Sequence, residues 1–387
     1  AAGGGSLLQF DGARLRVGPQ SAGANPGPAS YRRGGPLATT DANVLLGKIQ
    51  PAWFPKVFGP GADQALDREG VVQQFNALAL QVQQHTGRAT TAESLAEGFL
   101  QIAIQNMANA IKRISVARGY DVTQYTLQCF GGAGGQHACG VADALGMRRV
   151  FVHPLAGVLS AYGMGLADQL AMREAAIELP LCEAGLAAAA SSLATLGAAA
   201  RLEVASQGVA DDAITLHRKL HVRYQGTDTA LVVDMGPVAQ VQQQFEAAYR
   251  QRFAFLMPGR TLVIEAASVE AVGAGERFDT PADGAAHETY QPTPDATVRM
   301  HSGHWRDAAL HVRESLRAGA TIDGPAVIAD QNATTVVEPG WQAVLTAAGA
   351  LELQRVQARA TQHAIGTDAD PVMLEVFNNL FMNIAEQ

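Results

Sequence analysis

The stretch FGGAGGQHACGVADALG, residues 130–146, has four glycines among its first six residues and then changes to a regular apolar pattern. Residues 136–145 follow the i, i+3, i+4, i+7 spacing of one helix face, and Gly146 can end that helix. The flanking segments YTLQCF (125–130) and RRVFVHP (148–154) are β-prone. The stretch therefore predicts a strand–helix–strand unit with a parallel strand pair and a glycine-rich bend before the helix.

A glycine-rich bend before a helix suits the binding of a nucleotide. Without a Cβ, backbone N–H groups can converge on a phosphate, and the helix N-terminus adds partial positive charge. The alternative is a tight packing turn that binds nothing. The common fingerprints are not met, because His137 stands where G-x-G-x-x-G needs its third glycine, and no G-x-x-x-x-G-K-[ST] motif occurs. The predicted nucleotide contacts in the bend are Gly131, Gly132, Ala133, Gly134, Gly135, Gln136 and His137.

On the N-terminal side of the bend, the sequence predicts shaped loops followed by two helices. Residues 1–70 are rich in Gly and Pro, which favours loops around short strands. An apolar face begins at Val71 and a helix C-cap is expected at Gly87. The segment Thr90–Glu93 fits a capping box for a long helix that ends at Gly119.

On the C-terminal side, the pattern changes to mixed and then mostly antiparallel structure. An alanine-rich helix is expected over 183–207, a hairpin turns at 226–228, and 296–356 is predicted to be β. The fold class is therefore α/β over residues 1–175, followed by a mixed α+β, β-rich domain over residues 176–365.

Composition narrows the class of protein. Hydrophobic residues make up 48% of the 387 residues and charged residues 17%, against roughly 25% charged in typical soluble domains. The net charge of -8 argues against nucleic acid or an anionic membrane as partner, and no signal peptide or apolar run of membrane length was identified. The three cysteines lack metal or disulfide spacing, and histidine spacing predicts no metal site. These features predict a cytoplasmic protein.

Both ends of the sequence are predicted to be cut from a longer chain. The sequence opens with AAGGGS, without an initiator Met or a regular lead-in. Its last twenty residues carry an apolar helical face at Leu374, Phe377, Phe381 and Ile384 that has no cap or glycine stop.

Several long motifs together resemble the hydantoinase A/oxoprolinase family. They include the glycine stretch itself, VFVHPLAGVLSAYGMGLAD, RVGPQSAGANPGPASYRRGG, RYQGTDTAL and GPAVIADQNATTVVEPGW. Within the family the sequence is most similar to the ATP-dependent 5-oxoprolinases, on the evidence of GGQHAC, FPKVFGPGADQALD and the tail DPVMLEVFNNLFMNIAEQ. The resemblance spans almost the whole sequence.

The resemblance implies part of an actin-like ATPase that holds ATP between two lobes. Residues 1–175 would be an incomplete lobe of this fold, 176–365 the C-terminal domain of the A portion, and 366–387 the truncated start of the B portion. The missing N-terminal lobe and the rest of the B portion would be partners within the same chain, and the enzyme is expected to be oligomeric. The cofactors would be ATP and Mg²⁺, with most ligands outside this segment. A second glycine turn near the bend would add contacts from Gly3, Gly4, Gly5 and Ser6.

The implied reaction opens the lactam of 5-oxo-L-proline to L-glutamate with ATP hydrolysis, a step of glutathione metabolism. Phosphorylation of the amide oxygen would let water attack the carbonyl carbon, and a carboxylate could orient that water. Asp41, Asp168 and Asp228 are the candidates because each stands at an expected loop or strand end. The alternative role for each is an N-cap or turn residue.

Other interpretations stay open. The sequence also fits an ATP-dependent hydantoinase, a ketone carboxylase subunit, or a non-catalytic interaction subunit whose glycine bend only packs. The segment alone is predicted to be inactive and to bind ATP weakly or not at all.

Overall fold

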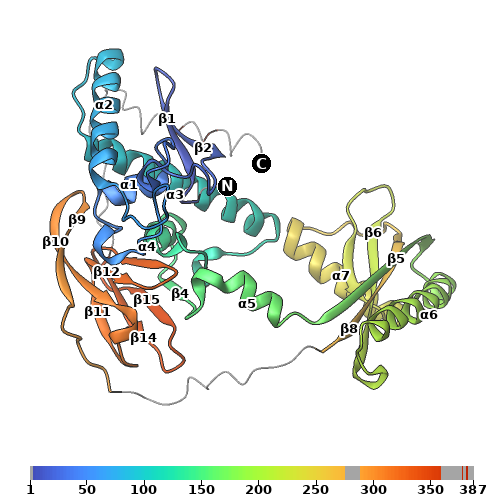
Figure 1. Ribbon diagram of the computed structural model, residues 1–387. Helices are drawn as coiled ribbons and strands as arrows, with labels where there is room; N and C mark the ends of the chain where they lie inside the picture. Colours follow the sequence, from blue (N-terminus) through green and yellow to red (C-terminus); the bar gives the residue numbers. More distant parts are fainter. Residues whose placement is uncertain (1–2, 275–287, 359–376, 378–380, 382–387) are drawn as a thin grey trace. The chain divides into compact units, whose positions relative to one another are not determined.

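The computed structural model of the chain describes residues 3–274 and 288–358, together with positions 377 and 381 (Figure 1). These residues form two compact units. The first unit contains described residues 3–115, 121–159 and 288–358, and the second contains 116–120 and 160–274. The first unit therefore combines segments from both ends of the sequence.

The N-terminal part of the first unit is a strand hairpin packed with three helices. Its elements are β1 (Ser6–Phe10), β2 (Leu15–Ser21), α1 (Thr39–Leu45), α2 (Arg68–Thr86) and α3 (Ala92–Ala117). Phe75 of α2 and Phe99 of α3 meet edge to face in the core of this part. The predicted stop of α2 at Gly87 is confirmed, with φ at 72° in the left-handed region.

The start of α3 lies one residue later than the capping box predicts. Thr91 rather than Thr90 is the capping residue, because its Oγ1 accepts the backbone N–H of Ser94 at 3.1 Å. Two adjacent threonines offer the same side-chain chemistry, so the sequence alone could not choose between them.

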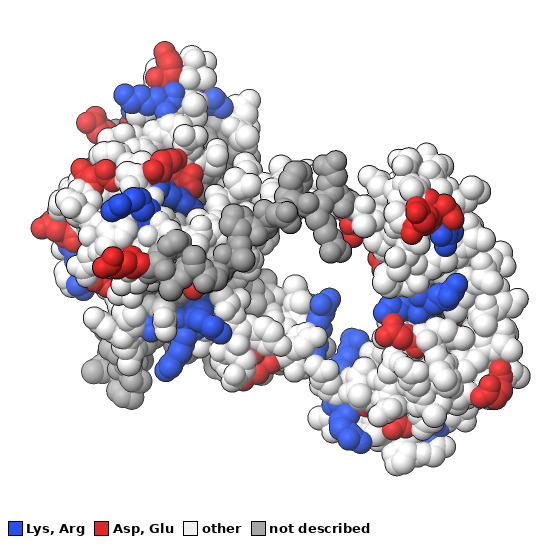
Figure 2. Space-filling view, turned by 90° about the horizontal axis from the view of Figure 1, so that it is seen from below, with Lys and Arg blue, Asp and Glu red and all other residues white. Residues whose placement is uncertain are grey.

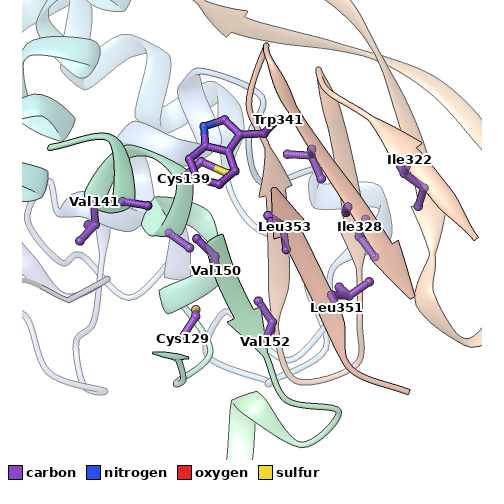
Figure 3. Close-up of a cluster of buried hydrophobic side chains, with 14 of the residues drawn as sticks. Cys129, Cys139, Val141, Val150, Val152, Ile322, Ile328, Trp341, Leu351 and Leu353 are labelled. Carbon is purple, nitrogen blue, oxygen red and sulfur yellow. The ribbon is translucent and has the colours of Figure 1, made fainter. Parts of the chain in front are cut away.

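The glycine bend lies at the edge of a five-stranded sheet with the order β11-β14-β15-β4-β3. The elements are β3 (Leu127–Cys129), α4 (Gly134–Leu145), β4 (Arg149–Val152), β11 (Thr321–Asp323), β14 (Trp341–Leu345) and β15 (Leu351–Arg355). β3 and β4 are parallel, so the predicted strand–helix–strand unit is confirmed. Helix α4 starts two residues before the predicted Gln136 and ends at Gly146 as predicted. Figure 3 shows side chains of α4, β4, β14 and β15 in one core, with Cys139 close to Trp341.

A second sheet of the first unit has the order β13-β12-β10-β9. Its strands are β9 (Ala296–Ser302), β10 (His304–Val312), β12 (Ala326–Ala329) and β13 (Thr334–Val337). Helix α4 packs against β13, and Cys139 Sγ lies 3.4 Å from the carbonyl oxygen of Val336. The β structure predicted over 296–356 is thus confirmed, although β10 and β12 are parallel rather than antiparallel.

The structure divides the chain differently from the predicted domains 1–175 and 176–365. The strands of residues 288–358 belong to the first unit, because β15 pairs with β4 from Leu351↔Val152 to Gln354↔Arg149. This pairing joins segments about two hundred residues apart, and local sequence patterns contain no signal for it. The predicted segment 366–387 lies outside the described residues, except Phe377 and Phe381, which are helical and exposed.

The second unit is a four-stranded antiparallel sheet with the order β5-β8-β6-β7. Its elements are α5 (Leu159–Gly165, beginning at the boundary), β5 (Gln169–Pro180), α6 (Glu183–Ser206), β6 (Ile214–Tyr224), β7 (Leu231–Asp234), α7 (Val238–Phe253) and β8 (Leu262–Gly273). Leu193 of α6 and Phe245 of α7 join Ile264 of β8 in one core, so both helices cover the same face of the sheet. The predicted hairpin of β6 and β7 is confirmed.

Helix α6 is long and apolar enough to cross a membrane when judged by length and composition alone, with a mean hydropathy of 1.2. The prediction that no run approaches the roughly 18 apolar residues of a membrane span does not hold for α6 when length and composition are the test. The structure places one face of α6 against β8 and β5, with Leu186 and Leu193 buried. A helix that covers a sheet has the same apolar stripe, so this test is weak evidence for a span.

Candidate functional site

The two predicted glycine turns lie side by side in the first unit. The turn at residues 3–6 is closed by the N–H of Ser6, which donates to the Gly3 carbonyl oxygen at 3.0 Å. A Cβ added to Gly4 would lie 2.7 Å from Thr40 Oγ1 and 3.3 Å from the Cβ of Ala133 in the glycine bend. The predicted proximity of the two turns is therefore confirmed, and only a residue without a side chain fits at position 4.

The bend between β3 and α4 is accessible at its tip. Gly131 has φ at 87°, and its N–H donates to the carbonyl oxygen of Ala156 at 2.8 Å. Among the described residues no side chain caps the N-terminus of α4, and its first turn contains no acidic residue. Two N–H groups at this end have acceptors within the bend, since Gly134 donates to the Gly131 carbonyl oxygen at 3.1 Å and Gln136 to that of Ala133 at 3.2 Å. The N–H groups of Gly132 and Ala133, together with the positive end of the helix dipole, can meet an anion or another acceptor.

The rest of the bend is packed against β13. A Cβ on Gly135 would lie 2.7 Å from the carbonyl oxygen of Thr334 and 2.9 Å from Thr335 Oγ1. Gln136 and His137 are buried as well. The packing alternative thus accounts for Gly135, whereas Gly131 to Gly134 remain at least partly accessible.

A cavity of about 1000 Å³ opens beside the bend. Phe130, Gly134 and His137 line it on the bend side, and Phe130 is 59% exposed. Residues of the β1–β2 hairpin and of the second half of α3 form the other walls: Arg14, Arg16, Val17, Asn106, Asn109, Ile111, Arg113 and Ile114. The cavity therefore combines apolar walls with three guanidinium groups, of which those of Arg14 and Arg16 also face the carboxylate of Asp11, at 3.9 and 2.8 Å. Such a mixture suits a ligand that has an anionic and an apolar part.

The α3 wall of the cavity was not predicted from the sequence. Asn106, Asn109 and Arg113 stand at i, i+3 and i+7 in α3, so their side chains share one face. This polar stripe is the sequence feature from which the α3 wall could have been predicted. Arg14 and Arg16 gave no such signal, because their alternation fits any half-exposed strand.

A buried polar group lies behind the bend, on the first turn of α4. Asn43 Nδ2 donates to Gln136 Oε1 at 2.9 Å and lies 3.5 Å from His137 Nε2. Burial, together with the nearby positive charge of Lys48, lowers the pKa of His137 to about 4. The imidazole is therefore neutral at physiological pH.

An ion pair ties this region to the C-terminal strands. Lys48 Nζ lies 2.5 Å from Glu338 Oε1, and Ser302 Oγ donates to Glu338 Oε2 at 3.0 Å. Lys48 follows α1, and Glu338 lies in the turn between β13 and β14. Neither Asn43, Lys48 nor Glu338 was predicted as a site residue, because their partners are distant in sequence.

Asp41 has a structural position. It is fully buried in the first turn of α1 and accepts backbone N–H groups of Ala29, Ser30 and Ala38 at 2.8–2.9 Å. Burial raises the pKa of its carboxyl group, and these hydrogen bonds act in the opposite direction. The geometry favours the capping alternative for Asp41 over contact with a substrate.

Asp168 and Asp228 lie in the second unit and do not share a site. Asp168 precedes β5, whose first residue pairs with Gly273, and Asp228 follows β6, whose last residue pairs with Leu262. Gly273 and Leu262 are the two ends of β8, roughly 35 Å apart at 3.3 Å per residue. Both carboxylates are exposed. A catalytic role for either stays a prediction.

Within the part of the chain that the structure describes, no three or more His, Cys, Asp or Glu side chains are close enough to hold a metal ion. Acidic and basic groups are interspersed and sparse on the face shown in Figure 2, as expected for 17% charged residues. The polar chemistry of the candidate site therefore comes from backbone amides, guanidinium groups and neutral side chains.

Comparisons with protein families cover most of the chain. The family model described as hydantoinase/oxoprolinase matches residues 1–173, and that of the hydantoinase/oxoprolinase C-terminal domain matches residues 183–356. The 5-oxoprolinase of Dictyostelium discoideum is 36% identical over the whole chain, and the chain spans 31% of its length.

Two solved structures have a similar fold. The nucleotide-free structure of acetone carboxylase matches with a TM-score of 0.67 at 25% identity, and the ATP-dependent caprolactamase of Pseudomonas jessenii with 0.74 at 24%. Each match covers 92% of this chain and 52% of the other chain. The mixed α/β architecture with several sheets is thus shared with both.

Proposed function

Because the chain belongs to the hydantoinase/oxoprolinase family, we propose that it supplies the nucleotide-binding part of an ATP-dependent 5-oxoprolinase. One observation carries the proposal. Two glycine turns meet at the uncapped N-terminus of α4, beside a cavity of about 1000 Å³. The chain spans 31% of its Dictyostelium relative, so the activity is proposed for the complete gene product.

The described residues fit a nucleotide. Backbone N–H groups of Gly132 and Ala133 would donate to phosphate or ribose oxygens, with the dipole of α4 behind them. Arg14, Arg16 and Arg113 would offset negative charge, and the exposed ring of Phe130 offers a flat apolar surface. A Mg²⁺ ion would be held largely by phosphate oxygens and water, as is common for this ion. We also propose that the first unit corresponds to part of an actin-like ATPase lobe.

ATP hydrolysis is what makes the opening of a lactam favourable. The amide carbon is a poor electrophile, and phosphorylation of its oxygen makes it accept water. The C–N bond then breaks, the ring nitrogen leaves as the amine of L-glutamate, and a second water molecule releases the phosphate. The part of this chain would be to hold the nucleotide with backbone amides and arginines, so that the transferred group meets the lactam oxygen. A cytoplasmic location and an oligomeric state stay predictions.

Substrate-dependent ATP hydrolysis by the complete gene product tests the proposal. The panel is 5-oxo-L-proline, hydantoin, caprolactam and acetone, chosen from the substrate classes of the family and of the similar structures. We expect 5-oxo-L-proline alone to stimulate ATP hydrolysis and to yield L-glutamate. Stimulation by another compound, without an effect of 5-oxo-L-proline, would contradict the substrate. A gene product that does not bind ATP would contradict the nucleotide site.

A further inference from the structure

His137 is the buried polar side chain of the cavity. It stands in the first turn of α4, is 4% exposed and lines the cavity together with Gly134, Ala138 and Val141. Its Nε2 lies 3.5 Å from Asn43 Nδ2. Among the described residues, its other ring nitrogen, Nδ1, makes no hydrogen bond.

The contact with Asn43 determines which nitrogen of His137 carries the proton. An amide nitrogen donates and does not accept, so Nε2 must be the accepting nitrogen. A neutral imidazole has one proton, which is therefore on Nδ1. The pKa of about 4 that burial gives His137 keeps the ring in this neutral form at pH 7.

Asn43 is itself held in one orientation. It is fully buried on α1, and its Nδ2 donates to Gln136 Oε1 at 2.9 Å. Its Oδ1 has no hydrogen-bond partner in the described structure. With Gln136 presenting its Oε1 to Asn43, reversing the Asn43 amide alone would place two oxygens against each other, so Gln136 keeps the nitrogen of Asn43 toward His137. An unsatisfied buried oxygen is uncommon and needs an explanation.

We propose, on the basis of the nucleotide site proposed above, that His137 Nδ1–H is the recognition donor of the cavity and that Asn43 is its positioning residue. The ligand would then present a hydrogen-bond acceptor of sp² type to this donor. Met107, Ile111 and Val141 line the same cavity. A hydrogen bond formed in such an apolar setting is stronger than one formed in water. Two groups of the proposed reaction have this chemistry, a ring nitrogen of the nucleobase and the carbonyl oxygen of the lactam.

The position of the proton can be measured directly on the 387-residue chain. Long-range ¹H–¹⁵N NMR of histidine-labelled protein at pH 7 should show His137 protonated at Nδ1 and not at Nε2. In Asn43→Leu we expect the Nε2-protonated form to appear, because the donor that held Nε2 is gone. Asn76→Leu, at an exposed position of α2, is the matched control and should leave the wild-type form. A wild-type ring protonated at Nε2 overturns the proposal.

Binding to the complete gene product tests the ligand. The probes are ATP, ribose 5-triphosphate without a base, 5-oxo-L-proline, and L-proline, which lacks the lactam carbonyl. His137→Phe should weaken either ATP or 5-oxo-L-proline by roughly 3- to 10-fold, the effect of one hydrogen bond, and leave the matching probe without an acceptor unchanged. Asn43→Leu should act in the same direction.

The outcomes separate the two proposals. A loss for ATP identifies the nucleobase as acceptor, and a loss for 5-oxo-L-proline identifies the lactam. Unchanged affinity of His137→Phe for both ligands overturns the role of His137 but leaves the nucleotide site standing. A wild-type protein that binds neither ATP nor 5-oxo-L-proline overturns both.

Discussion

Gly4 and Ala133 lie next to each other in the first unit, since a Cβ built on Gly4 would stand 3.3 Å from the Cβ of Ala133. The two residues belong to different glycine turns, one before β1 and one before α4. Thr40 holds the first turn in place, because both its N–H and its Oγ1 donate to the Gly4 carbonyl oxygen, at 2.8 and 2.9 Å. The two turns therefore form one backbone-lined surface, whose shape depends on the missing side chain at position 4.

Gly4→Val should separate the two turns. The added atoms would meet Thr40 Oγ1 and Ala133, and overpacking of this kind costs about 1–3 kcal/mol of unfolding free energy. Gly3→Val is the control, because a Cβ on Gly3 has no neighbour within 4 Å. All three tryptophans, Trp53, Trp305 and Trp341, lie in the first unit, so their fluorescence during urea unfolding reports on that unit.

The same pair of variants tests the nucleotide site. In the complete gene product, Gly4→Val should weaken ATP binding more than Gly3→Val does. Equal affinities for the two variants would contradict a role of the joined turns in binding, even if the stabilities differ as expected.

Asp41→Asn should lower the free energy of unfolding, and not only the enzymatic activity. The variant keeps one acceptor oxygen and places an NH₂ group against backbone donors, and losing hydrogen bonds to a buried carboxylate costs about 1.5–3 kcal/mol each. Asp228→Asn, in an exposed turn, should change unfolding free energy by less than about 0.5 kcal/mol. An Asp41→Asn protein with wild-type stability and no activity would instead restore Asp41 as a catalytic candidate.

The fold could be predicted where the signal is local. Gly87, Gly146 and the turn at 226–228 each end an element as expected, because a left-handed or tight turn needs particular residues within a few positions. The strand–helix–strand unit follows from the change of hydrophobic period around the bend. These predictions use information that is present in a window of about ten residues.

The site could be predicted only in part, because much of it is formed by contacts between segments that are distant in the sequence. The glycine bend was found from its own residue pattern and the turn at residues 3–6 from the family resemblance, whereas the arginines and asparagines of the cavity meet the bend through tertiary packing. Asn43 contacts α4, and Glu338 pairs with Lys48, although the partners are distant in the sequence. β15 pairs with β4, although the second unit lies between these two strands in the sequence. The carboxylate Asp41 looked catalytic because a cap and an active-site residue both stand at loop ends.

Arg313 should be essential for the support of the bend. Its guanidinium lies 3.4 Å from Asp330 Oδ2 and donates to the Gly349 carbonyl oxygen at 2.6 Å, with 11% of the side chain exposed. Asp330 begins the turn whose Asn332 carbonyl oxygen would lie 3.1 Å from a Cβ on Gly132. Arg313→Ala would leave a partly buried carboxylate without its counter-charge, which costs about 1–3 kcal/mol.

A matched pair on the surface provides the control for Arg313. Arg299 and Asp307 are 3.0 Å apart with side chains 61% and 69% exposed, so Arg299→Ala should cost less than about 1 kcal/mol. Urea unfolding followed by tryptophan fluorescence measures both variants. Similar losses for the two arginines would show that the Arg313 pair does not support the bend.

His137 should make the first unit less stable in mild acid. Its pKa is about 4 in the folded protein, against 6.5 for an exposed imidazole, so between these values the unfolded state binds more protons. Stability from this group is complete above pH 6.5 and falls as the pH drops toward 4. From pH 7 to pH 5 the loss is about 2 kcal/mol, at about 1.4 kcal/mol for each pH unit below 6.5. Urea unfolding of wild type and His137→Phe at both pH values checks this, and the variant should lose about 2 kcal/mol less than wild type. The same pH dependence in both proteins would contradict this prediction. It would mean that the His137 ring, which is buried against Asn43 in the structure, is charged or solvated in the folded state.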